Sequence, residues 1–133
     1  MPARIRFHNE AGSAVAETVM ITALLLIVVF GVIHLALALH IRTTLIDCAG
    51  EGARHGARTS STIEDGAQLT RDLIRSALSE GYAENVTAQR VNHDGIDVVE
   101  VTVSAPLPGI GFLGPSDVIT AEGHSLLEVH HVA

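Results

Sequence analysis

The chain has 133 residues, of which 47% are hydrophobic and 3% aromatic, and it carries a formal net charge of −7. This length allows one small domain beside a membrane segment. The acidic balance excludes a basic face for nucleic acid, and the scarcity of aromatic residues argues against stacking platforms for bases or sugars. A single cysteine, Cys48, excludes an intramolecular disulfide.

The first half of the chain is dominated by an apolar run of 22 residues from Thr18 to Leu39. As a helix, this run would extend about 33 Å, which matches the ~30 Å hydrocarbon core of a bilayer. We therefore predict a transmembrane helix over residues 13–41 and a single-pass protein of the cytoplasmic (inner) membrane. Arg4 and Arg6 precede the span, so the N-terminus is expected inside and the remainder outside.

A secretory signal peptide is the alternative interpretation of this run. Ala36-Leu37-Ala38 offers a small-x-small cleavage site, and cutting after Ala38 would release a soluble secreted protein. However, the run is longer than the ~7–15 apolar residues of a signal peptide. Glu17 also places an acid at its entrance, where a signal peptide does not favour one. These two features favour the membrane span.

Beyond the span, residues 42–60 are expected to continue the helix outward as a stalk, because no proline interrupts them. Small residues recur there at every fourth position on one side of the helix, and such rows allow a neighbouring helix to approach closely. That neighbour is either the chain's own head or a partner helix. Cys48 is either a small packed residue or the site of an intermolecular disulfide in an oxidising compartment. The two rows are Cys48, Gly52 and Gly56, and Ala49, Ala53 and Ala57.

Residues 61–133 are expected to form a small extracytoplasmic head, so the predicted fold class is α+β. A helix begins near Ser61 or Thr62, whose hydroxyl groups can cap it. Apolar residues keep helical spacing through Leu78, and Gly81 is expected to end this helix as a C′ glycine. The short helix is predicted to pack on a small antiparallel sheet.

The remainder of the head alternates with a period of two, which predicts about three strands. The first strand covers residues 86–91, and the turn 92–95 joins it to a second strand at 96–105 through the positive φ of Gly95. In the second strand, Val99, Val101 and Val103 share one face. A loop at 106–115 is expected to tuck apolar residues onto the core before a third strand at 117–129.

No pattern in the sequence predicts an enzyme, because there is no nucleophile elbow, phosphate loop or HExxH motif. His124, His130 and His131 lack a further clustered ligand, so neither a metal nor any other cofactor is predicted. Nucleic-acid binding is not expected either.

Three parts of the sequence resemble one protein family: the stretch Gly12-Ser-Ala-Val-Ala-Glu17, the apolar helix after it and the run 48–58. This is the TadE-like family, the minor pseudopilins of tight-adherence (type IV-like) pili. The resemblance covers about residues 11–58. It implies that residues 1–12 are a cytoplasmic prepilin leader, which a prepilin peptidase removes after Gly12 so that Ser13 becomes the N-terminus. It also implies that Glu17 pairs with the N-terminal amine of a neighbouring subunit during assembly.

The resemblance further implies the partners of the chain: the inner membrane, prepilin peptidase, other pilins and pseudopilins, and pilus-assembly platform proteins. Incorporation into a surface pilus is a further implication. Elementary physics agrees with the role of Glu17, because a lone carboxylate at the membrane edge is costly and is stabilised by a cation. Ser13 departs from the phenylalanine that begins many mature type IV pilins, which weakens an inference of N-methylation more than one of cleavage. A single-pass membrane-anchored interaction protein is the alternative function.

Overall fold

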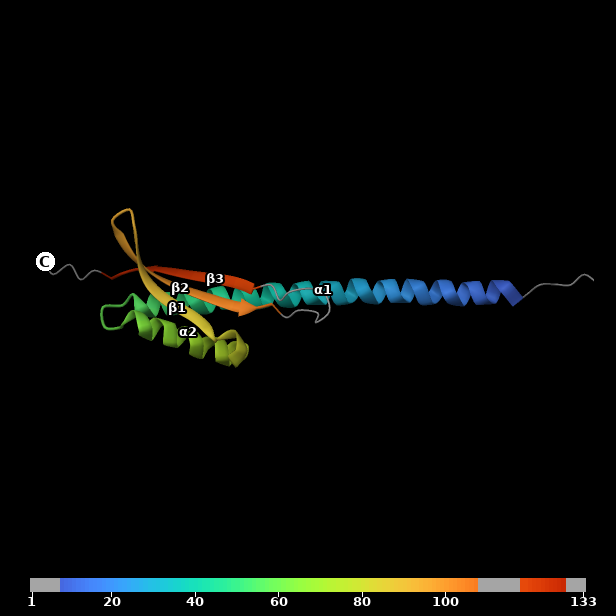
Figure 1. Ribbon diagram of the computed structural model, residues 1–133, viewed down its shortest axis with the longest axis horizontal. Helices are drawn as coiled ribbons and strands as arrows, with labels where there is room; N and C mark the ends of the chain where they lie inside the picture. Colours follow the sequence, from blue (N-terminus) through green and yellow to red (C-terminus); the bar gives the residue numbers. More distant parts are fainter. Residues whose placement is uncertain (1–7, 108–117, 129–133) are drawn as a thin grey trace, which may run out of the picture. The chain divides into compact units, whose positions relative to one another are not determined.

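The computed structural model describes residues 8–107 and 118–128 (Figure 1). Within these residues it contains a long N-terminal helix, a second short helix and a three-stranded antiparallel sheet, which confirms the predicted α+β class. The chain divides into two compact units, Met1–Leu37 and Ala38–Ala133. The elements in chain order are α1 (His8–Gly56), α2 (Ile63–Ala77), the 3-10 helix η1 (Glu80–Tyr82), β1 (Asn85–His93), β2 (Ile96–Pro106) and β3 (Val118–Leu126).

Helix α1 runs without a break from His8 to Gly56, because no proline occurs in this stretch. Threonine hydroxyl groups along it donate to the carbonyl oxygens four residues earlier. In the first unit, Thr18 Oγ1 donates to the Ala14 carbonyl at 2.9 Å. Such bonds leave these hydroxyl groups satisfied even where no water is present.

The sheet of the second unit has the order β1-β2-β3, with both pairs antiparallel. Its core lies on one face, where Val99, Val101 and Val103 of the central strand β2 are completely buried. The predicted alternation of this strand is therefore confirmed. Ile119 and Ala121 of β3 are buried on the same side, whereas Thr120 between them is exposed.

Both helical segments of the second unit cover this core face. Helix α2 packs mainly against β1, and α1 meets β2, where a β-carbon added to Gly56 would lie 3.5 Å from Val99 Cγ1. After β3, the Glu128 N–H donates to the Ala57 carbonyl at 3.0 Å and ties the chain to the end of α1. Figure 1 shows α2 and the later turns of α1 beside the strands. The opposite face of the sheet carries no helix within the part of the chain that the structure describes.

The turn between β1 and β2 fixes the register of these two strands. Asp94 and Gly95 have φ angles of 53° and 86°, so both central residues adopt the left-handed conformation of a tight hairpin. The Gly95 N–H donates to the Asn92 side chain at 3.0 Å, and the Asn92 amide donates to Asp97 at 2.7 Å. The predicted positive φ at Gly95 is confirmed, and Asp94 also has a positive φ.

Helix α2 begins with a reciprocal pair of hydrogen bonds. The Asp65 N–H donates to Thr62 Oγ1 at 3.1 Å, and the Thr62 N–H donates to Asp65 Oδ2 at 2.7 Å. This capping box selects Thr62 over Ser61 as the N-cap. The prediction for the other end is wrong, because the helix ends at Ala77 and Gly81 lies in η1. The cap residue Leu78 has a φ of −124°, so no left-handed glycine is needed there.

The capping box makes a prediction about acid stability. The hydrogen bond from the Thr62 backbone, and then that from its side chain, lower the pKa of Asp65. A carboxylate whose pKa is lower in the folded state stabilises that state above its ordinary pKa, and this contribution is lost as the pH falls through the folded value. We expect amide exchange in the first turn of α2 to lose protection below about pH 4, as measured by hydrogen–deuterium exchange.

In Asp65→Asn, this loss of amide-exchange protection at low pH should disappear, and the first turn of α2 should be less protected at pH 7. Asp94→Asn is the matched control, because the Asp94 side chain makes no hydrogen bond to the residues described by the structure and asparagine tolerates its positive φ. If Asp65→Asn still lost amide-exchange protection below about pH 4, this account would be contradicted.

The bounds of the two outer strands, β1 and β3, differ from the prediction. Strand β1 is longer than predicted, at Asn85–His93, and β3 is shorter, at Val118–Leu126. After β3, the Leu127 N–H donates to the Asp97 carbonyl at 3.0 Å. Residues 108–115 of the predicted loop, with Ile110, Phe112 and Leu113, lie outside the described residues.

Candidate functional site

Between Val19 and Ile33, exposed apolar side chains lie on every side of α1. Large apolar side chains are 50% exposed or more from Val15 to Leu35, and Leu24 is 63% exposed. One helix of the described residues is thus long and apolar enough to cross a membrane, and none of its most apolar stretch is buried. A surface of this kind is suited to lipid or to other apolar helices.

Gly12, Ser13 and Glu17 all lie within α1 and are all exposed. A β-carbon at Gly12 would meet no atom within 4 Å, so this position has space on the helix surface. Ser13 and Glu17 are one helical turn apart and therefore share a face of the helix. Glu17 forms no ion pair with any residue that the structure describes. The Gly12–Ser13 peptide bond is part of the helix.

The six small residues of the predicted rows are buried in the second unit. Gly52 shows most directly why they are small. A β-carbon at this position would collide with Thr70 Oγ1 of α2 and would lie 2.6 Å from the Gly66 carbonyl oxygen. Conversely, a β-carbon on Gly66 would lie 2.5 Å from the Gly52 carbonyl oxygen. The backbones of α1 and α2 are therefore in direct contact at this crossing.

The sheet approaches α1 equally closely. A β-carbon on Gly123 of β3 would collide with the backbone of Ala49 and Gly50. Thr70 completes the junction: its hydroxyl donates to the Gly66 carbonyl at 2.9 Å and lies 3.4 Å from the Cys48 carbonyl. Both rows of small residues thus face the chain's own head, which is one of the two neighbours that the sequence left open.

Cys48 is a buried free thiol within this junction. Burial, and then the nearby Asp47 carboxylate, raise the pKa of the Cys48 thiol. A buried thiol with a raised pKa forms little thiolate and reacts slowly. The structure therefore supports the packed role of Cys48 over an intermolecular disulfide.

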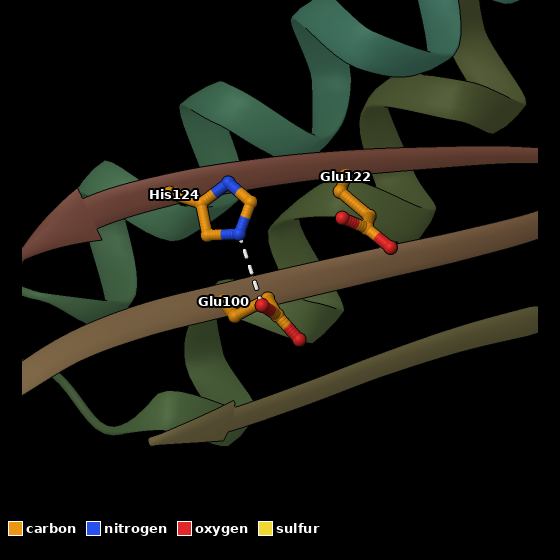
Figure 2. A group of neighbouring side chains, drawn as sticks. All are labelled: Glu100, Glu122 and His124. Atoms are coloured by element: carbon orange, nitrogen blue, oxygen red, sulfur yellow. Dashed lines mark hydrogen bonds and ion pairs between the residues drawn. The ribbon is translucent and has the colours of Figure 1, made fainter. Parts of the chain in front are cut away.

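The uncovered face of the sheet carries a group of polar side chains that the sequence interpretation missed (Figure 2). Glu100 of β2 lies directly opposite His124 of β3, and Glu122 is two residues before His124 on the same face. His124 Nε2 lies 2.9 Å from Glu100 Oε2. Figure 2 shows the three side chains on the side of the strands turned away from the helices. The spacing Glu122-x-His124 was visible in the sequence, but its third member is brought in only by strand register.

Glu100 is held in place from the other side as well. Gln89 Nε2 of β1 donates to Glu100 Oε1 at 2.8 Å. This hydrogen bond, followed by that of His124, lowers the pKa of Glu100. The carboxylate of Glu100 is thus fixed between neighbours on both adjacent strands. His130 and His131 lie outside the described residues.

Together these observations describe a protein with a long apolar helix and a small α+β head. One membrane-length apolar helix continues into a small α+β head and packs there through glycine and alanine. A family model described as TadE-like protein matches residues 12–54, about a third of the chain. This match confirms the resemblance to the TadE-like family over that segment and indicates a protein related to tight-adherence pili. No curated protein and no solved structure matches the chain.

Proposed function

We propose that the chain is a minor pseudopilin that takes part in the biogenesis of a tight-adherence, type IV-like pilus. A prepilin peptidase removes residues 1–12. The N-terminus lies on the cytoplasmic side of the inner membrane, and the head lies on the outer side. The observation that carries this proposal is the start of the family match at Gly12, the last residue of the proposed leader. The match then runs through Glu17 and the exposed apolar helix.

The geometry of α1 supports the proposed processing. Glycine destabilises a helix interior by about 1 kcal/mol relative to alanine, so Gly12 is a position where the helix unwinds at low cost. Cleavage after Gly12 leaves a new α-amine on Ser13, one turn from the Glu17 carboxylate and within similar reach of a neighbouring subunit's carboxylate. The amine thereby supplies the cation that a carboxylate at the membrane edge requires.

The exposed apolar surface of α1 before Leu37 supports the proposed partners. In this proposal, the surface first contacts lipid and then the corresponding helices of other pilins, pseudopilins and platform proteins. The chain is a substrate of the peptidase and catalyses no reaction itself. The TadE-like match covers the whole of this surface.

Determining the N-terminus of the protein from its native host tests the proposal. We expect a mature chain that starts at Ser13, and we expect Gly12→Asp to retain residues 1–12 while still inserting in the membrane. The aspartate blocks the peptidase because the residue before the cut must fit closely. Intact mass and membrane fractionation measure the two properties, and Ala11→Ser is the control that should be processed normally.

Each other outcome identifies a different protein. A start at Leu39 would identify a signal peptide and a soluble secreted head. A start at Met1 would identify a single-pass membrane-anchored interaction protein. If Gly12→Asp were still shortened by residues 1–12, the assignment of the cleavage site would be wrong.

A further inference from the structure

The group on the uncovered sheet face has the donor set of a metal site. Glu100, Glu122 and His124 can each offer one ligand atom, and these three atoms all lie within 4.8 Å of one another. They come from adjacent strands, which are paired in continuous register from Val98–Leu126 to Pro106–Val118. The three side chains lie beside one another on these two strands (Figure 2), so side-chain rotation can bring their ligand atoms to coordinating distances.

We propose that Glu100, Glu122 and His124 bind one divalent cation of the zinc class. One imidazole and two carboxylates are a borderline ligand set that suits Zn²⁺, and three protein ligands leave a fourth position open for water or a ligand from outside. This site is independent of the proposed role in pilus biogenesis.

The distances are compatible with tetrahedral coordination. Zinc–ligand bonds of about 2.0–2.2 Å place neighbouring ligand atoms about 3.4 Å apart. His124 Nε2 and Glu100 Oε2 are now 2.9 Å apart and must separate slightly. Glu122 must move inward, and its side chain is exposed and free to rotate. No backbone movement is needed.

The charges in the group favour a cation over a simple ion pair. The pair of His124 and Glu100 accounts for two of the three side chains. It leaves Glu122 without a partner among the described residues, beside a second carboxylate. Once the imidazole is neutral, as a metal ligand must be, the two carboxylates hold a charge that nothing in this group balances. A divalent cation balances it.

Gln89 supplies the outer support that metal ligands usually have. Its side-chain amide donates to Glu100 Oε1 at 2.8 Å, which leaves Glu100 Oε2 directed toward His124. Outer-shell partners of this kind orient a ligand, and their loss typically weakens metal binding by about 10–100-fold. A bound cation would also join the outer strand β3 to the central strand β2.

The test uses the full chain in detergent micelles, without a polyhistidine tag and with both His130 and His131 replaced by asparagine. Zn²⁺ is titrated calorimetrically and Co²⁺ by its d–d absorption. We expect one saturable site per chain, which is lost in Glu122→Gln and in His124→Asn and weakened about 10–100-fold in Gln89→Ala. His40→Asn, which changes an exposed histidine of α1, is the control and should bind as the parent does.

Circular dichroism of each variant shows whether the sheet is intact, which is expected because Gln89, Glu122 and His124 are exposed. The absence of a saturable Co²⁺ band in the parent chain would overturn the proposal. Binding that survives both Glu122→Gln and His124→Asn would overturn it as well.

Discussion

Replacing Gly52 by alanine should lower the free energy of unfolding of the head by about 2–3 kcal/mol. The new methyl group would occupy the place of Thr70 Oγ1 and press on the Gly66 carbonyl. Neither neighbour can move easily, because Thr70 is completely buried and the Gly66 carbonyl is part of the backbone of α2. The helices must then separate, and the hydrogen bond from Thr70 to the Gly66 carbonyl is disturbed with them.

Gly50→Ala provides a matched control two residues away on the same helix. A β-carbon at Gly50 would meet nothing within 4 Å. The substitution removes the conformational freedom of a glycine from the unfolded chain and should stabilise the head by about 0.4–1 kcal/mol. One chemical change, the addition of a methyl group, is therefore expected to have opposite signs at the two positions.

Thermal unfolding of the full chain in micelles, followed by circular dichroism, measures both effects. For a domain of this size, 1 kcal/mol shifts the midpoint by about 4–8 °C. We expect a fall of about 10 °C or more for Gly52→Ala and a small rise for Gly50→Ala. An unchanged or raised midpoint in Gly52→Ala would show that α1 and α2 are not in close contact at Gly52.

The small residues near Gly52 show how far the sequence could be taken. Their spacing predicts a close approach to one side of the helix, but a neighbouring subunit and the chain's own head require the same spacing. The neighbour is decided by contacts between distant residues, Gly52 with Thr70 and Gly123 with Ala49. Such contacts have no periodic signal in the sequence.

The polar group on the sheet illustrates the same limit. Alternation places Glu100 on one face of its strand and Glu122 and His124 on one face of theirs. Whether Glu100 lies opposite His124 depends on strand register, and a shift of one residue would move its side chain to the other face. The hairpin turn at Asp94–Gly95 fixes the pairing of β1 with β2 because it is local. The pairing of β2 with β3 follows a longer connection and could not be read in advance.

Glu17→Ala is expected to leave membrane insertion normal and to reduce incorporation into the assembled filament at least about tenfold, which corresponds to about 1.4 kcal/mol. In the proposed function, the carboxylate pairs with the Ser13 amine of a neighbouring subunit. Its loss leaves that amine unpaired at the membrane edge, where an isolated charge is costly. Glu17→Gln should behave alike, because it keeps the shape of the side chain and removes the charge. Quantitative immunoblotting of membrane and sheared-filament fractions measures both steps.

Two further variants separate pairing from a general effect of lost acidity. Glu10→Gln removes a carboxylate from the proposed leader and should leave assembly unchanged, because in the proposed function residue 10 is removed before assembly. Gly12→Asp prevents formation of the Ser13 amine, so adding Glu17→Ala to it should cause no further loss. Two changes that disrupt the same pair are non-additive, whereas independent effects add. Normal filament incorporation of Glu17→Ala, or a further loss in the double variant, would remove the proposed pairing between Glu17 and the amine.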